Sequence, residues 1–210
     1  MPTGRPSAGN VILFETTWGW CAARVGSGGV EVFQLPIASP RRAAVLFRER
    51  LAGDATVGHR RMGRYPWESS FPVDPSAAAL VRQVREYFAG KRRRFDLKVD
   101  WTSATPFRRK VWRALGRVPC GSTLTYGDLA HGIGRPRAAR AVGGAVAANP
   151  VPLIVPCHRV LPTGGGLGGF SGEGGVAMKQ RLLDFEGADT DSLLCKEHAP
   201  THWNSLQDFI

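Results

Sequence analysis

The sequence lacks the features that mark a membrane protein or a secreted one. No apolar run approaches the roughly eighteen residues that span a bilayer. The N-terminal stretch has no apolar segment of the kind that a secretory signal contains. The four cysteines, Cys21, Cys120, Cys157 and Cys195, lie too far apart to indicate a disulfide framework. We therefore expect a protein of the reducing cytoplasm with no membrane attachment.

Acidic residues are also scarce. The 210-residue chain has 28 lysines and arginines against 17 acidic residues, and Asp128 is the only acidic residue between Pro106 and Thr163. An excess of positive charge predicts a polyanionic partner, most simply nucleic acid. A compositional bias of the genome is the alternative, because arginine supplies 23 of the 28 basic residues. The concentration of charge in one segment favours the nucleic-acid interpretation.

Residues 11–101 predict a small α/β domain that follows a disordered N-terminus of residues 1–10. Ser39-Pro40 and Asp74-Pro75 each mark a helix start, because a capping side chain precedes a proline suited to the first helical position. Glycines mark where these helices end. The expected elements are strands at 11–17, 19–25, 30–35 and 95–101, and helices at 40–53 and 75–90.

Residues 105–187 predict a second, mostly helical domain that contains a helix–turn–helix. Thr105-Pro106 caps its first helix, Thr125 caps a short helix over 126–133, and Pro136 is expected to begin the next helix, which runs to about Ala148. That last helix consists almost entirely of small residues around one long side chain, Arg140. Small residues suit either close helix packing or entry into a narrow groove of DNA.

An apolar run at 151–155 predicts a buried strand that ends at Pro156, Cys157 and His158. Cys157 is a candidate nucleophile, because the thiolate is the reactive form and a neighbouring histidine favours it. A buried and inert cysteine is the alternative. Glu186, at the end of a helix over 176–185, is a candidate to orient His158. Adjacent residues of a strand point to opposite sides, so His158 should reach the sulfur through a water or a local turn.

Several short motifs occur in a fixed order between Thr105 and Gly187. They lie at 105–107, 125–130, 138–144, 149–150, 152–160, 169–172 and 182–187. In order and spacing they resemble the catalytic domain of the O6-alkylguanine-DNA alkyltransferases, also called methylated-DNA-protein-cysteine methyltransferases. Residues 11–101 resemble the N-terminal domain of that family more loosely. The resemblance implies an α/β fold class, with a ribonuclease H-like N-terminal domain and a winged helix–turn–helix-like C-terminal domain.

The resemblance also implies a function in DNA repair by direct reversal. The protein would bind double-stranded DNA through the minor groove, flip O6-alkylguanine out of the stack, and transfer the alkyl group irreversibly to its own cysteine. It would be a single-turnover methyltransferase with no cofactor and no metal, and O4-alkylthymine is a further candidate substrate. We expect a cytoplasmic monomer, associated with the nucleoid when bound to DNA, and several molecules could bind side by side.

Five residues acquire chemical roles from the resemblance. Cys157 is the alkyl acceptor, His158 is its base through a water, and Glu186 orients His158. Tyr126 donates a proton toward the guanine as it leaves. Asn149 orders the turn around the sulfur.

Further residues are implied to contact the DNA or the flipped base. Arg140 fills the space that the flipped base leaves, and Ser171 with its main chain hydrogen-bonds the guanine O6. The implied DNA-binding residues are Arg140, Tyr126, Ala138, Ala139, Gly143, Gly144, Arg135 and Arg159. The implied pocket residues are Pro152, Val160, Phe170, Ser171 and Gly172.

Two segments depart from the family pattern. The loop around Glu173 is longer than the family's commonest form, so we expect it to affect which alkyl groups the pocket accepts. The acidic tail over 188–210 carries Cys195, His198 and His202, three possible metal ligands. A structural zinc site normally needs four ligands, so we expect no metal there.

Three rival functions explain part of the pattern. A damage sensor that binds alkylguanine without repairing it would need some disabling change other than loss of Cys157, which is present. A plain helix–turn–helix regulator explains the charge but not the motif at 156–159. A cysteine hydrolase explains the cysteine, histidine and glutamate but not Arg140 or the glycine-rich helix.

Overall fold

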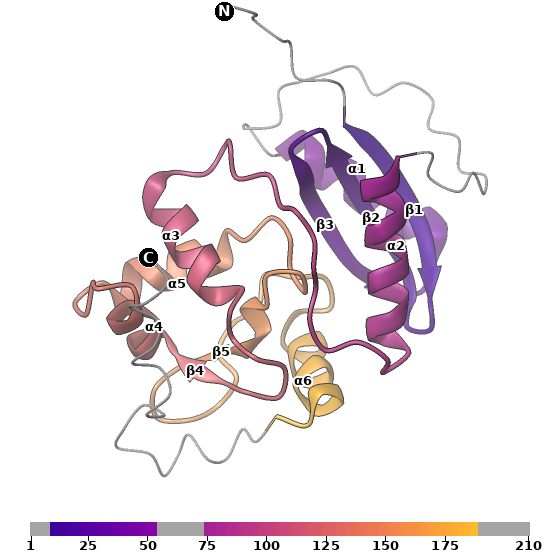
Figure 1. Cartoon of the computed structure of the whole chain (residues 1–210). Coiled ribbons are helices and arrows are strands. Elements are labelled where there is room, and N and C mark those ends of the chain that lie inside the picture. The colour runs from indigo at the N-terminus through magenta and orange to yellow at the C-terminus, as the bar shows by residue number, and fades with distance from the viewer. Residues whose placement is uncertain (1–8, 54–73, 189–210) are drawn as a thin grey trace, which may run out of the picture. The chain divides into compact units, whose positions relative to one another are not determined.

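The computed structural model describes residues 9–53 and 74–188 (Figure 1). The chain divides into two compact units with the boundary between Ser103 and Ala104. The fold class is α/β, as predicted, because a small antiparallel sheet with two helices precedes a mostly helical unit.

The first unit is built on a three-stranded antiparallel sheet in the order β1-β2-β3. Its strands are β1 (Asn10–Thr16), β2 (Gly19–Gly26) and β3 (Gly29–Ile37). Short turns join the strands, so each strand pairs with its neighbour in the sequence. At Gly29 the backbone φ is +117°, and a Cβ atom there would overlap the Lys98 carbonyl. The turn between β2 and β3 therefore requires glycine at this position.

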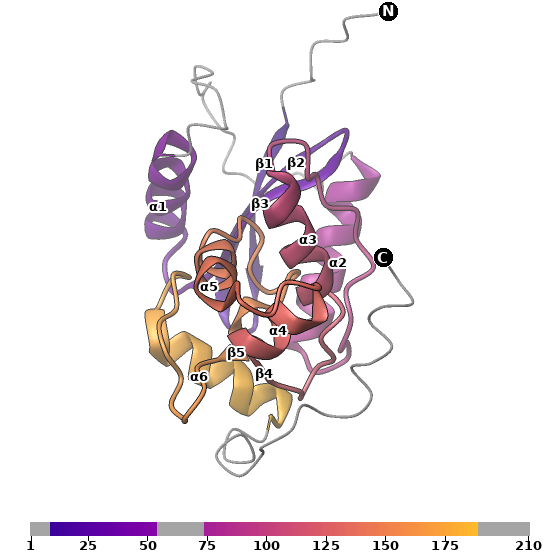
Figure 2. The ribbon, with the colours of Figure 1, turned by 90° about the vertical axis from the view of Figure 1, so that its left-hand side faces the viewer.

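Two helices cover opposite faces of this sheet, α1 (Pro40–Gly53) and α2 (Pro75–Phe88) (Figures 1 and 2). Both begin at the prolines that the sequence indicated, and the Asp74 side chain caps α2 by accepting from the Ser76 backbone N–H at 2.7 Å. Phe47 and Leu51 of α1 pack against the sheet. The alternating pattern of the strands thus gives each helix an apolar surface to cover.

The expected strand at 95–101 is wrong. The segment makes one isolated parallel bridge, between Val99 and Val30. Side-chain exposure still alternates along it, but the Gln83 side chain occupies both backbone groups of Asp96, donating to its carbonyl at 2.9 Å and accepting from its N–H at 2.8 Å. A backbone that is satisfied by a side chain does not extend a sheet.

The second unit packs three helices around a common core, α3 (Pro106–Leu115), α4 (Tyr126–Gly132) and α5 (Ala139–Ala147). The remaining elements are β4 (Leu124–Thr125), the 3-10 turn η1 (Cys157–Arg159), β5 (Val160–Leu161) and α6 (Gly175–Glu186), and β4 and β5 pair in parallel. The predicted caps are present: Thr105 caps α3, and Thr125 forms a capping box with Asp128 at the start of α4. The Trp112 indole donates to the Ala145 carbonyl at 2.8 Å and so fastens α3 to α5.

Helix α5 begins later than predicted. Pro136 lies in a turn and not at the first helical position, and the helix begins at Ala139. The Ala138 N–H donates to the Arg135 carbonyl at 2.8 Å, which makes Pro136 the second residue of a tight turn. The fixed φ of proline suits that position as well as it suits a helix start, so the local signal was ambiguous.

The expected strand at 151–155 is also wrong, although all five residues are buried. The chain turns back here: the Val155 N–H donates to the Val151 carbonyl at 3.0 Å, and Leu153 has a φ of +75°. Pro150, Pro152 and Pro156 flank or interrupt the run, and proline cannot donate to a sheet ladder. Burial was predicted correctly, but the strand was not.

Candidate active site

Cys157, His158 and Arg159 form the 3-10 turn η1, and all three are buried. The turn follows directly from the loop before it, because the Cys157 N–H donates to the Val155 carbonyl at 2.8 Å and the Arg159 N–H to the Pro156 carbonyl at 3.0 Å. The sequence had suggested that these residues alternate across a strand. They lie in a turn instead. The backbone makes a local turn at His158, one of the two features that the sequence suggested.

Asn149 holds the loop that leads into η1. Its side-chain amide donates to the Val155 carbonyl at 2.8 Å, and its side-chain oxygen accepts from the Val151 N–H at 3.1 Å. One buried side chain thus ties both ends of the turn together. The unfavourable backbone at Leu153 is maintained by these bonds, since a positive φ is uncommon for a residue other than glycine.

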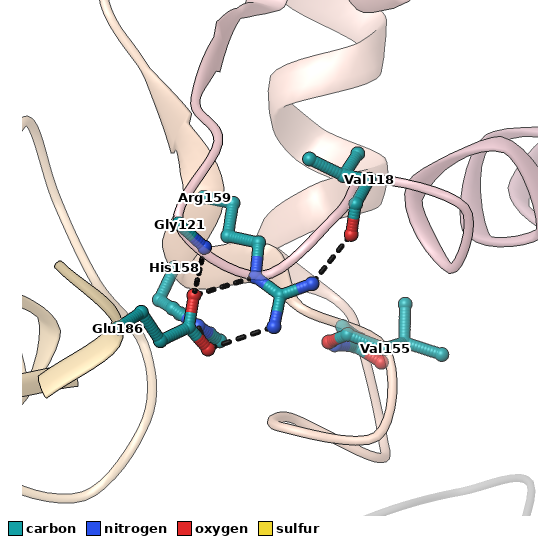
Figure 3. Close-up of polar contacts among 7 residues, drawn as sticks. Val118, Gly121, Val155, His158, Arg159 and Glu186 are labelled. Carbon is teal, nitrogen blue, oxygen red and sulfur yellow. Dashed lines mark hydrogen bonds and ion pairs between the residues drawn. The ribbon is translucent and has the colours of Figure 1, made fainter. Parts of the chain in front are cut away.

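Glu186, near the end of α6, lies at the centre of a buried hydrogen-bond network (Figure 3). One oxygen, Oε1, accepts from His158 Nε2 at 3.0 Å and from Arg159 Nη2 at 2.7 Å. The other, Oε2, accepts from Arg159 Nε at 2.8 Å and from the Gly121 N–H at 3.4 Å. Burial by itself would raise the pKa of Glu186, but the hydrogen bonds from His158 and Arg159 and the charges of these two groups hold it well below its usual range.

The network determines which nitrogen of His158 carries the proton. An ionised carboxylate only accepts, so Nε2 must donate to Glu186. The other ring nitrogen, Nδ1, is buried and has no hydrogen-bond partner among the residues that the structure describes. Burial lowers the pKa of His158, although Glu186 acts in the opposite direction. A neutral ring with a lone pair on Nδ1 is ready to accept a proton.

Two further polar side chains lie close enough to Cys157 to interact with it electrostatically. Tyr126 is the first residue of α4, and burial and then Cys157 raise the pKa of its hydroxyl. Lys179 of α6 is buried and donates to the Val160 carbonyl at 2.7 Å and to the Leu167 carbonyl at 2.6 Å. Burial lowers the pKa of Lys179 to about 8, against the influence of Cys157.

The sequence analysis missed Lys179, although a signal was present. Lys179, Leu182, Leu183 and Glu186 share the buried face of α6, at the spacing of one helical stripe. A lysine on the apolar face of a helix is unusual and marks a position where its ammonium group must find partners.

Helix α5 carries an exposed stripe of small residues around Arg140. Val142, Ala145 and Val146 are buried against the unit, whereas Arg140 and Gly144 are exposed. A Cβ atom built at Gly144 would meet nothing within 4 Å, and one at Gly143 would meet only the Tyr126 ring at 3.8 Å. Packing inside this protein therefore does not require glycine at either position, which removes close packing as the explanation for these two glycines.

Basic residues are exposed just before α5 and at its start. Arg135 and Arg140 are exposed as a DNA-binding role requires, and so is Arg137, which the sequence analysis did not select. Ala138 and Ala139 are half-buried beside them. The prediction that Arg159 binds DNA is wrong: it is buried, and its guanidinium is engaged by Glu186 and by the Val118 carbonyl.

The predicted pocket residues differ in their exposure. Pro152 and Val160 are buried, and Phe170 and Gly172 are half-buried. Ser171 is exposed and donates to the carbonyl of Ala147, the last residue of α5, at 2.9 Å. This bond fastens the glycine-rich loop before α6 to the end of α5.

The surroundings of Cys21 make it a poor candidate for the nucleophile. Cys21 is completely buried in the first unit, and burial raises the pKa of its thiol far above the usual range. Cys120 is half-buried. Cys195, His198 and His202 lie outside the described residues.

The chain is similar to known proteins. A family model described as "6-O-methylguanine DNA methyltransferase, DNA binding domain" matches residues 106–188. Proteins named methylated-DNA-protein-cysteine methyltransferase are similar to the chain, one from Shigella flexneri at 40% identity over 141 residues (67% of this chain and 78% of the relative). Another, from Mycolicibacterium paratuberculosis, is 44% identical over 141 residues (65% of this chain and 84% of the relative).

Solved structures are also similar. The Mycobacterium tuberculosis O6-methylguanine methyltransferase superposes with a TM-score of 0.61 at 29% identity, covering 90% of this chain and 99% of that one. The M. tuberculosis OGT in complex with DNA superposes with a TM-score of 0.58 at 31% identity, covering 88% of this chain and 98% of that one.

In the described part of the chain, no helix has both the length and the apolar character needed to cross a bilayer.

Proposed function

This chain belongs to the methylated-DNA-protein-cysteine methyltransferase family, and from that premise we propose that it repairs O6-alkylguanine in DNA by moving the alkyl group to Cys157. One observation carries the assignment of the cysteine. Cys157 stands beside His158, whose Nε2 donates to the ionised Glu186 and whose Nδ1 remains unpartnered among the described residues. Cys21, by contrast, lies in a site that keeps its thiol protonated.

The reaction is a displacement at the alkyl carbon. The proton of the Cys157 thiol passes to Nδ1 of His158, directly or through a water, and the thiolate sulfur attacks. A carbon–sulfur bond forms as the bond from carbon to O6 breaks, and the electron pair of that bond passes into the guanine. Tyr126 gives a proton to the departing base, which leaves as neutral guanine. Its hydroxyl is protonated at neutral pH, because burial and then Cys157 raise its pKa.

The product on the protein is a thioether, which water does not cleave under cellular conditions. Each molecule therefore transfers one alkyl group, and the reaction needs no cofactor because the damaged DNA supplies the alkyl group. The roles of Glu186 and Asn149 are to position other groups: the first orients His158, and the second holds the turn that presents Cys157.

DNA binding is assigned to α5 and the turn before it. The exposed stripe of small residues lets the helix backbone approach the floor of the minor groove, and Arg140 is the one side chain on it long enough to occupy the position of a flipped base. The target carbon is unreachable inside the stack, so flipping is a physical requirement. The Ser171 loop, fastened to the end of α5, would receive the base. Because the partner is DNA, we place the protein in the cytoplasm, at the nucleoid.

The damage-sensor alternative is not favoured. A sensor has no use for a nucleophile, yet here Cys157 is present together with a base whose tautomer is set by a buried carboxylate. The regulator alternative leaves Cys157 and His158 unexplained. The hydrolase alternative leaves the small residues and Arg140 of α5 unexplained.

The test is the intact mass of the protein after mixing with a duplex that contains one O6-methylguanine, followed by peptide mapping. We expect a gain of one methyl group on Cys157, which saturates at one per protein molecule. Cys120→Ser should behave like the wild type, and Cys157→Ala should gain nothing while still binding the duplex. Methylation of another cysteine, or continued turnover, would contradict the proposal.

A further inference from the structure

We propose that Arg159 is a positioning residue that orients Glu186 and balances its negative charge, and thereby keeps His158 neutral with its proton on Nε2 and its lone pair directed away from Glu186. This inference rests on the proposed function of Cys157 and His158. It replaces the DNA-binding role that the sequence suggested for Arg159.

The guanidinium of Arg159 is held mainly by Glu186. Its Nε and Nη2 donate to the two oxygens of Glu186 at 2.8 and 2.7 Å, in the fork arrangement that suits a carboxylate. Its Nη1 donates to the Val118 carbonyl, which anchors the fork to the chain that follows α3 (Figure 3). A lysine could not reproduce these three directions, because its ammonium is a single point of charge on a flexible stem.

The fork also determines what is left for His158. Besides the contacts with Arg159 on both oxygens and with the Gly121 N–H on Oε2, the carboxylate accepts from His158 Nε2 on Oε1. Glu186 can therefore orient only one nitrogen of the ring. The opposite nitrogen, Nδ1, stays available as the base for the thiol.

Charge balance explains why a cation is needed here. The charged groups that act on His158 are Glu186, Arg159 and Lys179, and both Tyr126 and Lys179 act on Cys157. Arg159 neutralises the buried carboxylate. If that cation were removed, Glu186 would be neutralised most easily by a proton on His158, and a protonated ring can no longer accept the proton of the thiol.

The experiment measures the single-turnover rate of alkyl transfer against pH in the full-length protein, for the wild type and for Arg159→Met, Arg159→Gln and Arg159→Lys. Arg24→Met is the matched control, because it removes an arginine–glutamate pair of the first unit, with Glu31, that takes no part in the site. Circular dichroism and thermal unfolding show which variants fold, and rates are compared per folded molecule.

We expect the two neutral variants to transfer at least about tenfold more slowly at neutral pH, with the acid limb of the rate profile displaced upward by about one pH unit, so that the rate recovers at higher pH. Arg159→Lys keeps the charge, so its acid limb should stay near the wild-type position even though its rate falls. If Arg159→Met does not fold, Arg159→Gln carries the same test.

Two results would overturn the inference. One is a wild-type profile in the neutral variants. The other is a loss of rate by the same factor at every pH, as a purely structural role would give. If the wild type itself fails to transfer an alkyl group to Cys157, the proposed function fails, which is distinct from a failure confined to the Arg159 variants.

Discussion

Each of the two units buries a cysteine, and the two cysteines have opposite surroundings. Cys21 lies in the sheet of the first unit, is completely buried, and has a thiol whose pKa burial raises. Cys157 is 5% exposed, yet it has Lys179 and Tyr126 within electrostatic reach and a histidine next to it in the chain. Burial alone therefore does not distinguish an inert cysteine from a nucleophile. The difference lies in the polar groups that are buried with it.

The two units also differ in how they use some of their buried polar residues. In the first unit, Gln34 and Gln83 are buried and bond to backbone groups, a structural use. In the second unit, three buried ionisable groups (His158, Arg159 and Glu186) bond to one another. A network of that kind is costly to bury, and truncating one member leaves another charge unpaired. Under the proposed function, this network supports the reacting cysteine.

The largest effect on alkyl transfer should come from replacing one of the two buried cysteines, Cys157, by alanine. Cys157→Ala removes the acceptor, so repair should fall to zero while binding to alkylated duplex survives. Cys21→Ala should leave the rate of transfer unchanged and lower the free energy of unfolding by about 1 kcal/mol, the usual cost of a small core truncation. Single-turnover transfer and denaturant unfolding of both variants measure this. A loss of transfer in Cys21→Ala, with the protein folded, would break the contrast.

Next in size is the loss of the carboxylate that supports His158. Glu186→Gln should slow transfer by a factor on the order of 1,000, because His158 is no longer held in the required tautomer. It should also destabilise the fold by about 3 kcal/mol at neutral pH, since the Arg159 charge is left unpaired. Stopped-flow transfer and thermal unfolding provide the two readouts.

The stability effect of Glu186 should depend on pH in a defined direction. The pKa of Glu186 is lower in the folded chain than its ordinary value of 4.5, so the ionised group stabilises the fold above about pH 4.5. That contribution is lost as the pH falls from 4.5 toward the folded-state pKa. The difference in Tm between the wild type and Glu186→Gln should therefore shrink on acidification. A difference that stays constant down to pH 3 would contradict the ionised state assigned here.

Tyr126→Phe tests whether the second polar neighbour of Cys157 acts in the reaction. Removing the hydroxyl should slow transfer by a factor on the order of 100, because the guanine must then leave without a proton donor. The ring itself remains, so its contact with α5 at Gly143 and the stability of the fold should change little. The same rate in both proteins would show that the proton comes from elsewhere, for example from water.

The smallest effect is expected from Gly144→Ala on α5, which should change stability and DNA affinity in opposite directions. Gly144→Ala should stabilise the protein by about 1 kcal/mol, because alanine is the better helix former and a Cβ there meets nothing within 4 Å. The same methyl group would stand on the face proposed to enter the groove, so affinity for duplex should fall severalfold. Ala52→Gly, at an exposed position of α1, is the matched control and should lower stability without changing DNA affinity. A more stable Gly144→Ala that binds DNA equally well would assign the groove contact to another surface.

Local signals predicted most of the helices and the sheet. Ser39-Pro40, Asp74-Pro75, Thr105-Pro106 and the Thr125 capping box each depend on neighbouring residues, and each begins a helix where expected. The wrong predictions of strands and helix starts occur where a distant side chain or a tight turn competes with the local signal. The Gln83 side chain hydrogen-bonds to the backbone of Asp96, and Pro136 lies in a tight turn instead of a helix. The Asn149 amide holds a turn in the buried apolar run that resembles a strand.

The sequence by itself determined the α/β fold class, the family resemblance and the candidate nucleophile, because these depend on residue types and spacings along one segment of chain. The tertiary structure alone decided the burial and the partners of Arg159 and Lys179. Both are cations, and charge in a sequence normally indicates solvent or a polyanionic partner. Their burial follows from packing α6 against η1, which brings Glu186 to Arg159 across 27 residues and the Val160 carbonyl to Lys179 across 19. Which group lies beside a buried charge is determined by the folded chain and not by the local sequence.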